Sequence, residues 1–157
     1  GFLGRGPLLD LGVHVVDLAR WLLGDDIDQV RCRLEPACSG DPEEKAEMEV
    51  RLNGGCRGTL RIGWRGAERI GRAEAVGSAG RAQVDWGTCE VTYAFHDCPP
   101  VRLSYEDRPT ILATLRGFLR ALTEGAPMPV SAEDGLAAVR LIDACYESAR
   151  RGQVVST

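Results

Sequence analysis

Asp10, His14 and Asp17, near the N-terminus, have residue types and a spacing suited to proton-transfer chemistry. Their i, i+4, i+7 spacing places the three side chains on one stripe of a helix. A charged Asp10 beside His14 can fix the tautomer of the imidazole and hold its proton. An imidazole oriented in this way is a general acid and base in outline. We therefore take Asp10 and His14 as the candidate catalytic residues, with Asp17 beside them as a candidate substrate ligand.

Each of the three residues also has a purely structural interpretation. Asp10 can cap loop amides, His14 can be a core histidine with satisfied hydrogen bonds, and Asp17 can hold the chain that follows it. Against this, burying a carboxylate or an imidazole is costly unless it is paired, so packing alone would favour leucine here. Residue type and spacing leave both interpretations open.

The segment around these residues predicts one helix from residue 7 to residue 23. Gly6 suits the N-cap, Pro7 the first helical position and Gly24 the C-terminal end. Gly12 lets backbone or ligand come close. Because the helix is apolar nearly all round, we expect it to be buried on every side. Its apolar residues are Leu8, Leu9, Leu11, Val13, Val15, Val16, Leu18, Ala19, Trp21, Leu22 and Leu23.

Beyond this helix the apolar residues alternate with polar ones, which indicates β-strands. Asn53-Gly54 between two such runs is a strong hairpin signal. The connections are short, and short connections favour antiparallel pairing. The expected strands are residues 30–34, 47–52, 60–65, 73–76, 82–86, 90–95 and 101–105.

Two further helices are expected near the C-terminus. One starts near Thr110 and ends at Gly125, and the other has Ser131 as its N-cap with Asp134 in the capping-box position. This order of elements predicts an α+β fold, an open, mainly antiparallel sheet with helices packed on one face. We expect residues 1–157 to form a single domain. Arg and Glu alternate on the sheet's other face, which suits either a solvated surface or a polar, cross-paired oligomer interface.

The composition argues against several classes of protein and site. The formal net charge is −4 at pH 7 with both signs interspersed, which argues against nucleic acid as a partner. No apolar run is long enough to cross a membrane. The cysteines form no CxxC pair and only two histidines are present, so no metal site is expected. We expect buried, reduced thiols in a cytoplasmic protein. The cysteines are Cys32, Cys38, Cys56, Cys89, Cys98 and Cys145.

Residues 4–24 also resemble a known family. They read GRGPLLDLGVHVVDLARWLLG. This is similar to the opening of the C-terminal domain of the Gfo/Idh/MocA family, with a glycine-rich entry, then D-x-G-x-H-x-x-D, then an apolar helix end. Residues 74–82 resemble the family's strand, turn and returning strand, and residues 148–155 resemble its usual ending. The resemblance covers essentially the whole chain and half of a typical family member.

The resemblance implies an NAD(P)-dependent oxidoreductase acting on sugars, polyols and related alcohols. In this family the N-terminal half is a Rossmann domain, and the C-terminal half supplies substrate contacts and usually the oligomer interface. Asp10 and His14 match the family's catalytic Asp and His, so His14 would relay the hydroxyl proton and Asp10 would orient it. Their usual third partner is a lysine in an E-K-P motif of the Rossmann half. Lys45 follows Glu44 but precedes Ala46, and we do not assign it that role.

The dinucleotide fingerprint is missing from this chain. Gly1, Gly4 and Gly6 give G-x-x-G-x-G rather than G-x-G-x-x-G, and no strand precedes them. We therefore expect NAD or NADP to serve the whole enzyme while the nucleotide-binding domain is absent from residues 1–157. The purified chain should show no saturable binding of NAD(P)H by fluorescence or calorimetry.

Four further residues are weaker candidates for substrate contacts. Arg5 lies in the glycine-rich entry and could meet an anionic substrate or a phosphate. Asp17 shares the stripe of the catalytic pair. Trp64 and Tyr105 could stack on a sugar ring, although aromatic strand residues more often belong to the core. His96 follows a strand and is expected on the surface.

Three functions remain open on this reasoning. The first is the substrate domain of an NAD(P)-dependent oxidoreductase, forming a homo-oligomer through its sheet and completed by a Rossmann domain. The second is a stand-alone, cofactor-free isomerase, epimerase or lyase that uses Asp10 and His14 for proton transfer. The third is a non-catalytic binding or oligomerisation module. The resemblance favours the first.

Overall fold

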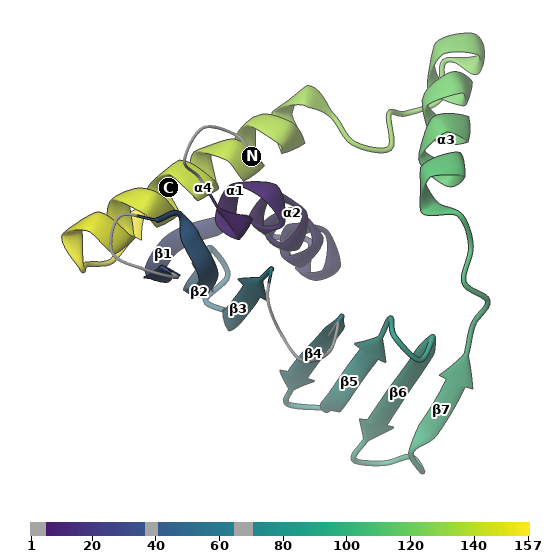
Figure 1. Cartoon of the computed structure of the whole chain (residues 1–157). Coiled ribbons are helices and arrows are strands. Elements are labelled where there is room, and N and C mark those ends of the chain that lie inside the picture. The colour runs from purple at the N-terminus through teal and green to yellow at the C-terminus, as the bar shows by residue number, and fades with distance from the viewer. Residues whose placement is uncertain (1–5, 37–40, 65–70) are drawn as a thin grey trace. The chain divides into compact units, whose positions relative to one another are not determined.

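The computed structural model describes residues 6–36, 41–64 and 71–157, and the chain divides into two compact units (Figure 1). The first unit comprises Gly1–Arg65 and Val130–Thr157, and the second comprises Gly66–Pro129. Each unit contains one four-stranded sheet, and every strand pair in both sheets is antiparallel.

The sheet of the first unit has the strand order β3-β2-β1-β8, and three helices cover one of its faces (Figure 1). Its strands are β1 (Ile27–Pro36), β2 (Glu43–Leu52), β3 (Arg57–Gly63) and the short β8 (Val155–Ser156). The helices are α1 (Pro7–Asp10), α2 (Gly12–Leu23) and α4 (Ala132–Arg151). The predicted Asn53-Gly54 hairpin joins β2 to β3, where Leu52 and Cys56 close the turn with a backbone hydrogen bond.

The core of the first unit lies between this sheet and α4. Val30 and Cys32 on β1 face their partners Val50 and Met48 on β2, and all four are buried. Ile142, fully buried on α4, belongs to the same apolar cluster. Successive side chains of a strand point to opposite faces, so residues along β1 and β2 alternate between the covered face and the open face of the sheet.

The N-terminal helix differs from its prediction in two ways. It breaks at Leu11, which has φ −100° and ψ −29°, so that α1 and α2 are separate helices. It is also not buried on every side, because only Gly12 and Val16 of α2 are buried and Trp21 is 76% exposed. The expectation of all-round burial was wrong, since α2 packs on α4 and β3 along one stripe only.

The sheet of the second unit has the strand order β4-β5-β6-β7. Its elements are β4 (Arg72–Gly77), β5 (Gly80–Asp85), β6 (Glu90–Phe95), β7 (Val101–Ser104) and the helix α3 (Thr110–Glu124). None of its described residues, 71–129, is buried. The ladders of this sheet are continuous, so its regularity comes from backbone pairing rather than from a core.

The α+β fold class with antiparallel strands is confirmed, and the strands are distributed over two sheets rather than one. The capping box of Ser131 and Asp134 is confirmed at the start of α4. The strand β8 was not predicted. Burial holds for Cys32 and Cys145 but is wrong for Cys56 and Cys98, which are exposed, and Cys89 is partly buried. Cys38 lies outside the described residues. Among the described helices, none has the length and apolarity needed to span a bilayer.

Candidate active site

The residues that carry the candidate catalytic pair rest on a tightly packed base. Leu8, Gly12 and Val16 form the buried stripe of α1 and α2. A Cβ atom built on Gly12 would lie 3.0 Å from the Cδ1 of Ile142 and 3.1 Å from that of Leu8. An added Cβ would require these side-chain ends to give way by a few tenths of an ångström, so Gly12 allows α2 to pack closely on its neighbours.

Asp10 and His14 lie on the exposed side of these helices. Asp10 is the last residue of α1, and His14 is in the first turn of α2. The break at Leu11 stands between them, and the backbone N–H of His14 donates to the Leu11 carbonyl at 3.1 Å. Within the described residues, no hydrogen bond joins Asp10 to His14. Both side chains are open to an incoming substrate.

Trp64 is the partner that the structure gives to Asp10. Its indole Nε1 donates a hydrogen bond of 2.9 Å to the Asp10 Oδ2, although the two residues are 54 positions apart. Trp64 follows β3, and its backbone N–H donates to the Glu44 carbonyl at 3.2 Å. The ring is 50% exposed, so it can orient Asp10 and still offer a face to a ligand. Of the six predicted site residues, the structure joins Asp10 and Trp64 by a hydrogen bond, and His14 follows on the adjoining turn.

Asp17 belongs to a different set of contacts. Its Oδ1 lies 3.8 Å from the Nη1 of Arg20. Arg20 is held more closely by Asp26, at 2.8 Å, and lies 3.6 Å from Asp134 on α4. Hydrogen bonds from Ser131, together with the Arg20 charge, keep the pKa of Asp134 below its ordinary value. Asp17 is therefore at the edge of a structural ion-pair network that ties α2 to α4.

The remaining predicted residues lie outside the described part of the first unit. Arg5 lies outside the described residues. Tyr105 is in the second unit and is 39% exposed, and loss of hydration and the nearby Cys89 raise the pKa of its phenol. His96 is exposed, as expected for a surface histidine.

Sequence reasoning missed Glu43, the buried carboxylate at the start of β2, which is 6% exposed. Its Oε1 accepts hydrogen bonds from the backbone N–H groups of Gly6 at 3.0 Å and Leu8 at 3.2 Å, and from the Tyr146 hydroxyl at 2.9 Å. Strand alternation places Glu44 inward, but the register shift between Glu35 and Pro36 turns Glu43 inward instead. No pattern in the sequence signals this shift.

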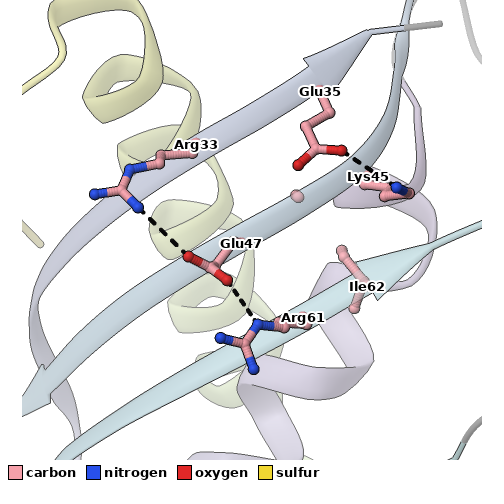
Figure 2. A pocket seen from close by; sticks show the side chains of 7 residues that line it. Arg33, Glu35, Lys45, Glu47, Arg61 and Ile62 are labelled. Atoms are coloured by element: carbon pink, nitrogen blue, oxygen red, sulfur yellow. Dashed lines mark hydrogen bonds and ion pairs between the residues drawn. The ribbon is translucent and has the colours of Figure 1, made fainter.

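The open face of the first unit's sheet carries a shallow hollow lined by charged side chains (Figure 2). Glu47 on β2 lies 3.6 Å from Arg33 on β1 and 2.6 Å from Arg61 on β3. The hydrogen bond from Arg61 lowers the pKa of the Glu47 carboxyl. Lys45 pairs with Glu35 at 3.3 Å. Each of these charges has a partner within the chain, so the hollow is a poor place for an ionic substrate.

The residues present do not fit a dinucleotide. Both described sheets are antiparallel, whereas the dinucleotide fold holds its pyrophosphate at a glycine-rich turn of a parallel βαβ unit. The described residues also contain no group of three or more His, Cys, Asp and Glu side chains that could hold a metal ion. An imidazole and a carboxylate, such as those of His14 and Asp10, are groups that can transfer protons.

The sequence of this chain matches a known protein family. Residues 2–83 match the profile described as "GFO/IDH/MocA C-terminal domain". The D-apiose dehydrogenase of Rhizobium rhizogenes is 27% identical over 166 aligned positions, which cover 93% of this chain and 47% of that protein. The rhizopine catabolism protein MocA of Rhizobium meliloti is 29% identical over 153 positions, which cover 92% of this chain and 44% of that protein.

A solved structure has the same fold. The crystal structure of GenD2 from gentamicin A biosynthesis, in complex with NAD, matches with a TM-score of 0.80 at 26% sequence identity. The match covers 98% of this chain and 48% of that one. The chain spans about half the length of each of these three relatives.

Proposed function

Because this chain belongs to the GFO/IDH/MocA family and matches its C-terminal domain, we propose that it is the substrate-binding and catalytic half of an NAD(P)-dependent oxidoreductase. The substrate is a sugar, a polyol or a related alcohol, the class to which D-apiose belongs. Because the described residues do not fit a dinucleotide, the cofactor in this proposal is bound by a Rossmann domain outside residues 1–157. The residues of this chain then bind the substrate and handle the proton.

His14 is the proton acceptor in this proposal. It is exposed on the first turn of α2, beside Asp10, where a substrate hydroxyl can reach its imidazole. When a hydroxyl is oxidised to a carbonyl it loses its proton, and a neutral imidazole can accept that proton. In the reverse direction, the imidazolium returns the proton to the carbonyl oxygen.

Asp10 orients His14 or the substrate, and Trp64 holds Asp10. The single observation that carries the proposal is the hydrogen bond of 2.9 Å from the Trp64 indole to Asp10, since it fixes an exposed carboxylate beside the only histidine of α2. The half-exposed Trp64 ring supplies an apolar face of the kind on which sugar rings stack. Arg5, Asp17 and Tyr105 remain weaker candidates for substrate contacts.

The test uses the intact gene product, whatever its length, with a panel of sugars and polyols and with NAD+ or NADP+. His14→Ala should lower kcat/KM by roughly a hundredfold to ten-thousandfold, the usual contribution of a general acid–base. His96→Ala is the matched control because the chain has only two histidines and both are exposed, and it should leave kcat/KM unchanged. Retention of near-normal turnover by His14→Ala would refute the catalytic role of this helix.

A hydrogen-exchange assay distinguishes the oxidoreductase from a cofactor-free enzyme. The missing dinucleotide fingerprint favours considering an isomerase, epimerase or lyase that works by proton transfer alone. In D₂O such an enzyme would exchange a carbon-bound hydrogen of its substrate without NAD(P), and His14→Ala would abolish the exchange. An oxidoreductase would turn over its substrate only when NAD(P) is present.

We also propose that the chain forms a homo-oligomer through the open face of β1, β2 and β3 in a cytoplasmic setting. The supporting observation is the set of cross-strand ion pairs on this face, which leaves it nearly neutral (Figure 2). Glu47→Arg would place an arginine between Arg33 and Arg61, so that three arginines would lie side by side. Sedimentation analysis should then show the variant as a smaller species than the wild type, and an unchanged mass would exclude this face.

A further inference from the structure

The buried Glu43 carboxylate joins three elements of the first unit at one atom. Its Oε1 accepts from the N–H groups of Gly6 and Leu8 in the first turn of α1, and from the hydroxyl of Tyr146 on α4. Glu43 itself belongs to β2. A buried acceptor that satisfies three donors is costly to disturb, because each donor would be left without a partner.

The helix α1 has no N-terminal cap of its own. Its N-cap residue is Gly6, which has no side chain to accept a hydrogen bond. The first N–H groups of any helix need acceptors from outside the helix. Here a carboxylate 35 to 37 positions away supplies them, as a capping side chain ordinarily would.

The backbone is shaped to permit this contact. A Cβ atom on Gly6 would lie 1.9 Å from the Glu43 carbonyl oxygen and 2.8 Å from its side-chain Cδ. No residue other than glycine can therefore occupy position 6 without moving α1 away from β2. The glycine and the carboxylate serve the same close approach.

We propose that Glu43 is a positioning residue, which fixes the start of α1 and thereby the placement of Asp10 and His14. The inference rests on the proposed function for its catalytic meaning, although the anchoring can be tested without it. Asp10 is two residues beyond Leu8, at the end of this four-residue helix. Releasing the Leu8 amide loosens α1 as a whole, because a single helical turn has little stability of its own.

The first measurement is NMR on the 15N-labelled 157-residue chain. Trp64→Phe identifies the Trp64 indole signal, which reports the hydrogen bond to Asp10, and hydrogen exchange reports the Gly6 and Leu8 amides. Glu43→Ala should accelerate exchange of both amides by about tenfold or more and shift the indole signal. Glu49→Ala is the matched control, because Glu49 lies on β2 with its side chain half exposed and paired with Arg33 on the open face. It should change neither signal.

Two milder variants keep the test decisive if Glu43→Ala fails to fold. Glu43→Gln retains an acceptor oxygen at the same reach but loses the charge that strengthens its hydrogen bonds. It should therefore accelerate exchange of the Gly6 and Leu8 amides measurably, though less than Glu43→Ala does. Tyr146→Phe removes one donor to the carboxylate and leaves the α1 amides bonded, so it should shift the indole signal less than Glu43→Gln does. If neither Glu43 variant alters the α1 amides or the Trp64 indole, the positioning role is refuted.

Turnover of the intact gene product distinguishes the two proposals. Glu43→Gln should lower kcat more than it raises KM, because a displaced general base harms the chemical step before it harms binding. If the NMR signals change and His14→Ala leaves turnover intact, the anchoring stands and the proposed function fails. If His14→Ala abolishes turnover while Glu43→Gln leaves both kcat and the NMR signals at wild-type values, the proposed function stands and the positioning role fails.

Discussion

The two units of this chain contain similar sheets and very different interiors. Both sheets have four antiparallel strands, and register shifts occur only between β1 and β2 among the described strand pairs. Every buried apolar side chain of the described residues nevertheless belongs to the first unit. In the second unit, α3 has a clear apolar face, yet Ile111 is 77% and Leu122 is 62% exposed.

This difference shows that an amphipathic pattern predicts an element and not its burial. The pattern of α4 and that of α3 are both helical, but only α4 packs against the sheet of its own unit. The candidate active site lies on the unit that has the core. Asp10 and His14 are exposed, and the helices that carry them are held by the buried residues Leu8, Gly12 and Val16 on their opposite side. A catalytic group needs such a rigid base, because small displacements reduce the rate strongly.

The largest expected effect comes from the same substitution in α4 and in α3. Leu141 is 3% exposed and Leu119 is 56% exposed. Leu141→Ala leaves a cavity in the core and should lower the free energy of unfolding by about 2–5 kcal/mol. Leu119→Ala should lower it by less than about 0.5 kcal/mol. Urea unfolding followed by circular dichroism measures both.

This pair of variants can also contradict the contrast between the buried face of α4 and the exposed α3. Equal losses of stability for Leu141→Ala and Leu119→Ala would mean that α3 is covered in solution. The contrast between the units would then describe the isolated chain only. Hydrogen exchange along α3 would locate the protection that such a cover provides.

Thiol reactivity gives the second contrast. Cys145 on α4 is fully buried, and a hydrogen bond with Cys32 together with burial raises the pKa of its thiol. Cys98 in the second unit is exposed. Because the thiolate is the reactive form, iodoacetamide should label Cys98 about a thousandfold faster than Cys145. Mass spectrometry of the labelled peptides measures the ratio, and Cys56, exposed in the first unit, controls for the unit itself. Comparable labelling of Cys145 and Cys98 would show that α4 opens readily from β1.

The sequence contained the signals for most elements because those signals are local. Asn53-Gly54 predicted the hairpin between β2 and β3, and Ser131 with Asp134 predicted the start of α4. Each signal depends on turn or capping chemistry within a few residues. The exposure of Trp21 could not be predicted in the same way, because it depends on which side of α2 meets another element.

The candidate site was only half predictable for the same reason. The spacing of Asp10 and His14 is local, and it identified them as candidates while leaving a structural interpretation open. The contact between Trp64 and Asp10 spans 54 positions, and the inward turn of Glu43 depends on a register shift between β1 and β2. Neither the contact nor the shift has a local signal, so these contacts of Trp64 and Glu43 emerged only with the fold.

The capping box of α4 gives a smaller, pH-dependent effect. The Ser131 hydroxyl accepts from the Asp134 N–H at 3.1 Å, so Ser131→Ala should cost about 1 kcal/mol of stability. Hydrogen bonds from Ser131 lower the pKa of the Asp134 carboxyl below its ordinary value of 3.8. A lowered folded-state pKa stabilises the fold above the ordinary value, and this stabilisation is lost as the pH falls through the folded-state value.

Asp134→Asn isolates the charge in that box. Its unfolding free energy should lie below that of the wild type at neutral pH, and the gap should close as the pH falls below about 4. Glu133→Gln, one residue earlier in the same helical turn and outside the capping box, should produce a smaller gap. A gap that is independent of pH would assign the loss at position 134 to geometry rather than to charge.

The smallest effects are expected from cross-strand ion pairs, which both units possess. Arg61 on β3 pairs with Glu47 in the first unit, and Arg102 on β7 pairs with Glu90 in the second. All of these charged side chains are at least partly exposed to solvent. Each substitution to alanine should therefore change the rate of amide exchange in its own sheet by no more than about threefold. Glu47 retains Arg33 as a second partner when Arg61 is removed, so Arg61→Ala should have the weaker effect. Raising the salt concentration should reduce both effects, because mobile ions screen exposed pairs. If Arg102→Ala instead accelerates exchange throughout β4 to β7, ion pairs contribute more to the second sheet than to the first. The physical reason would be that the second sheet has no buried core among its described residues to compensate for a lost pair.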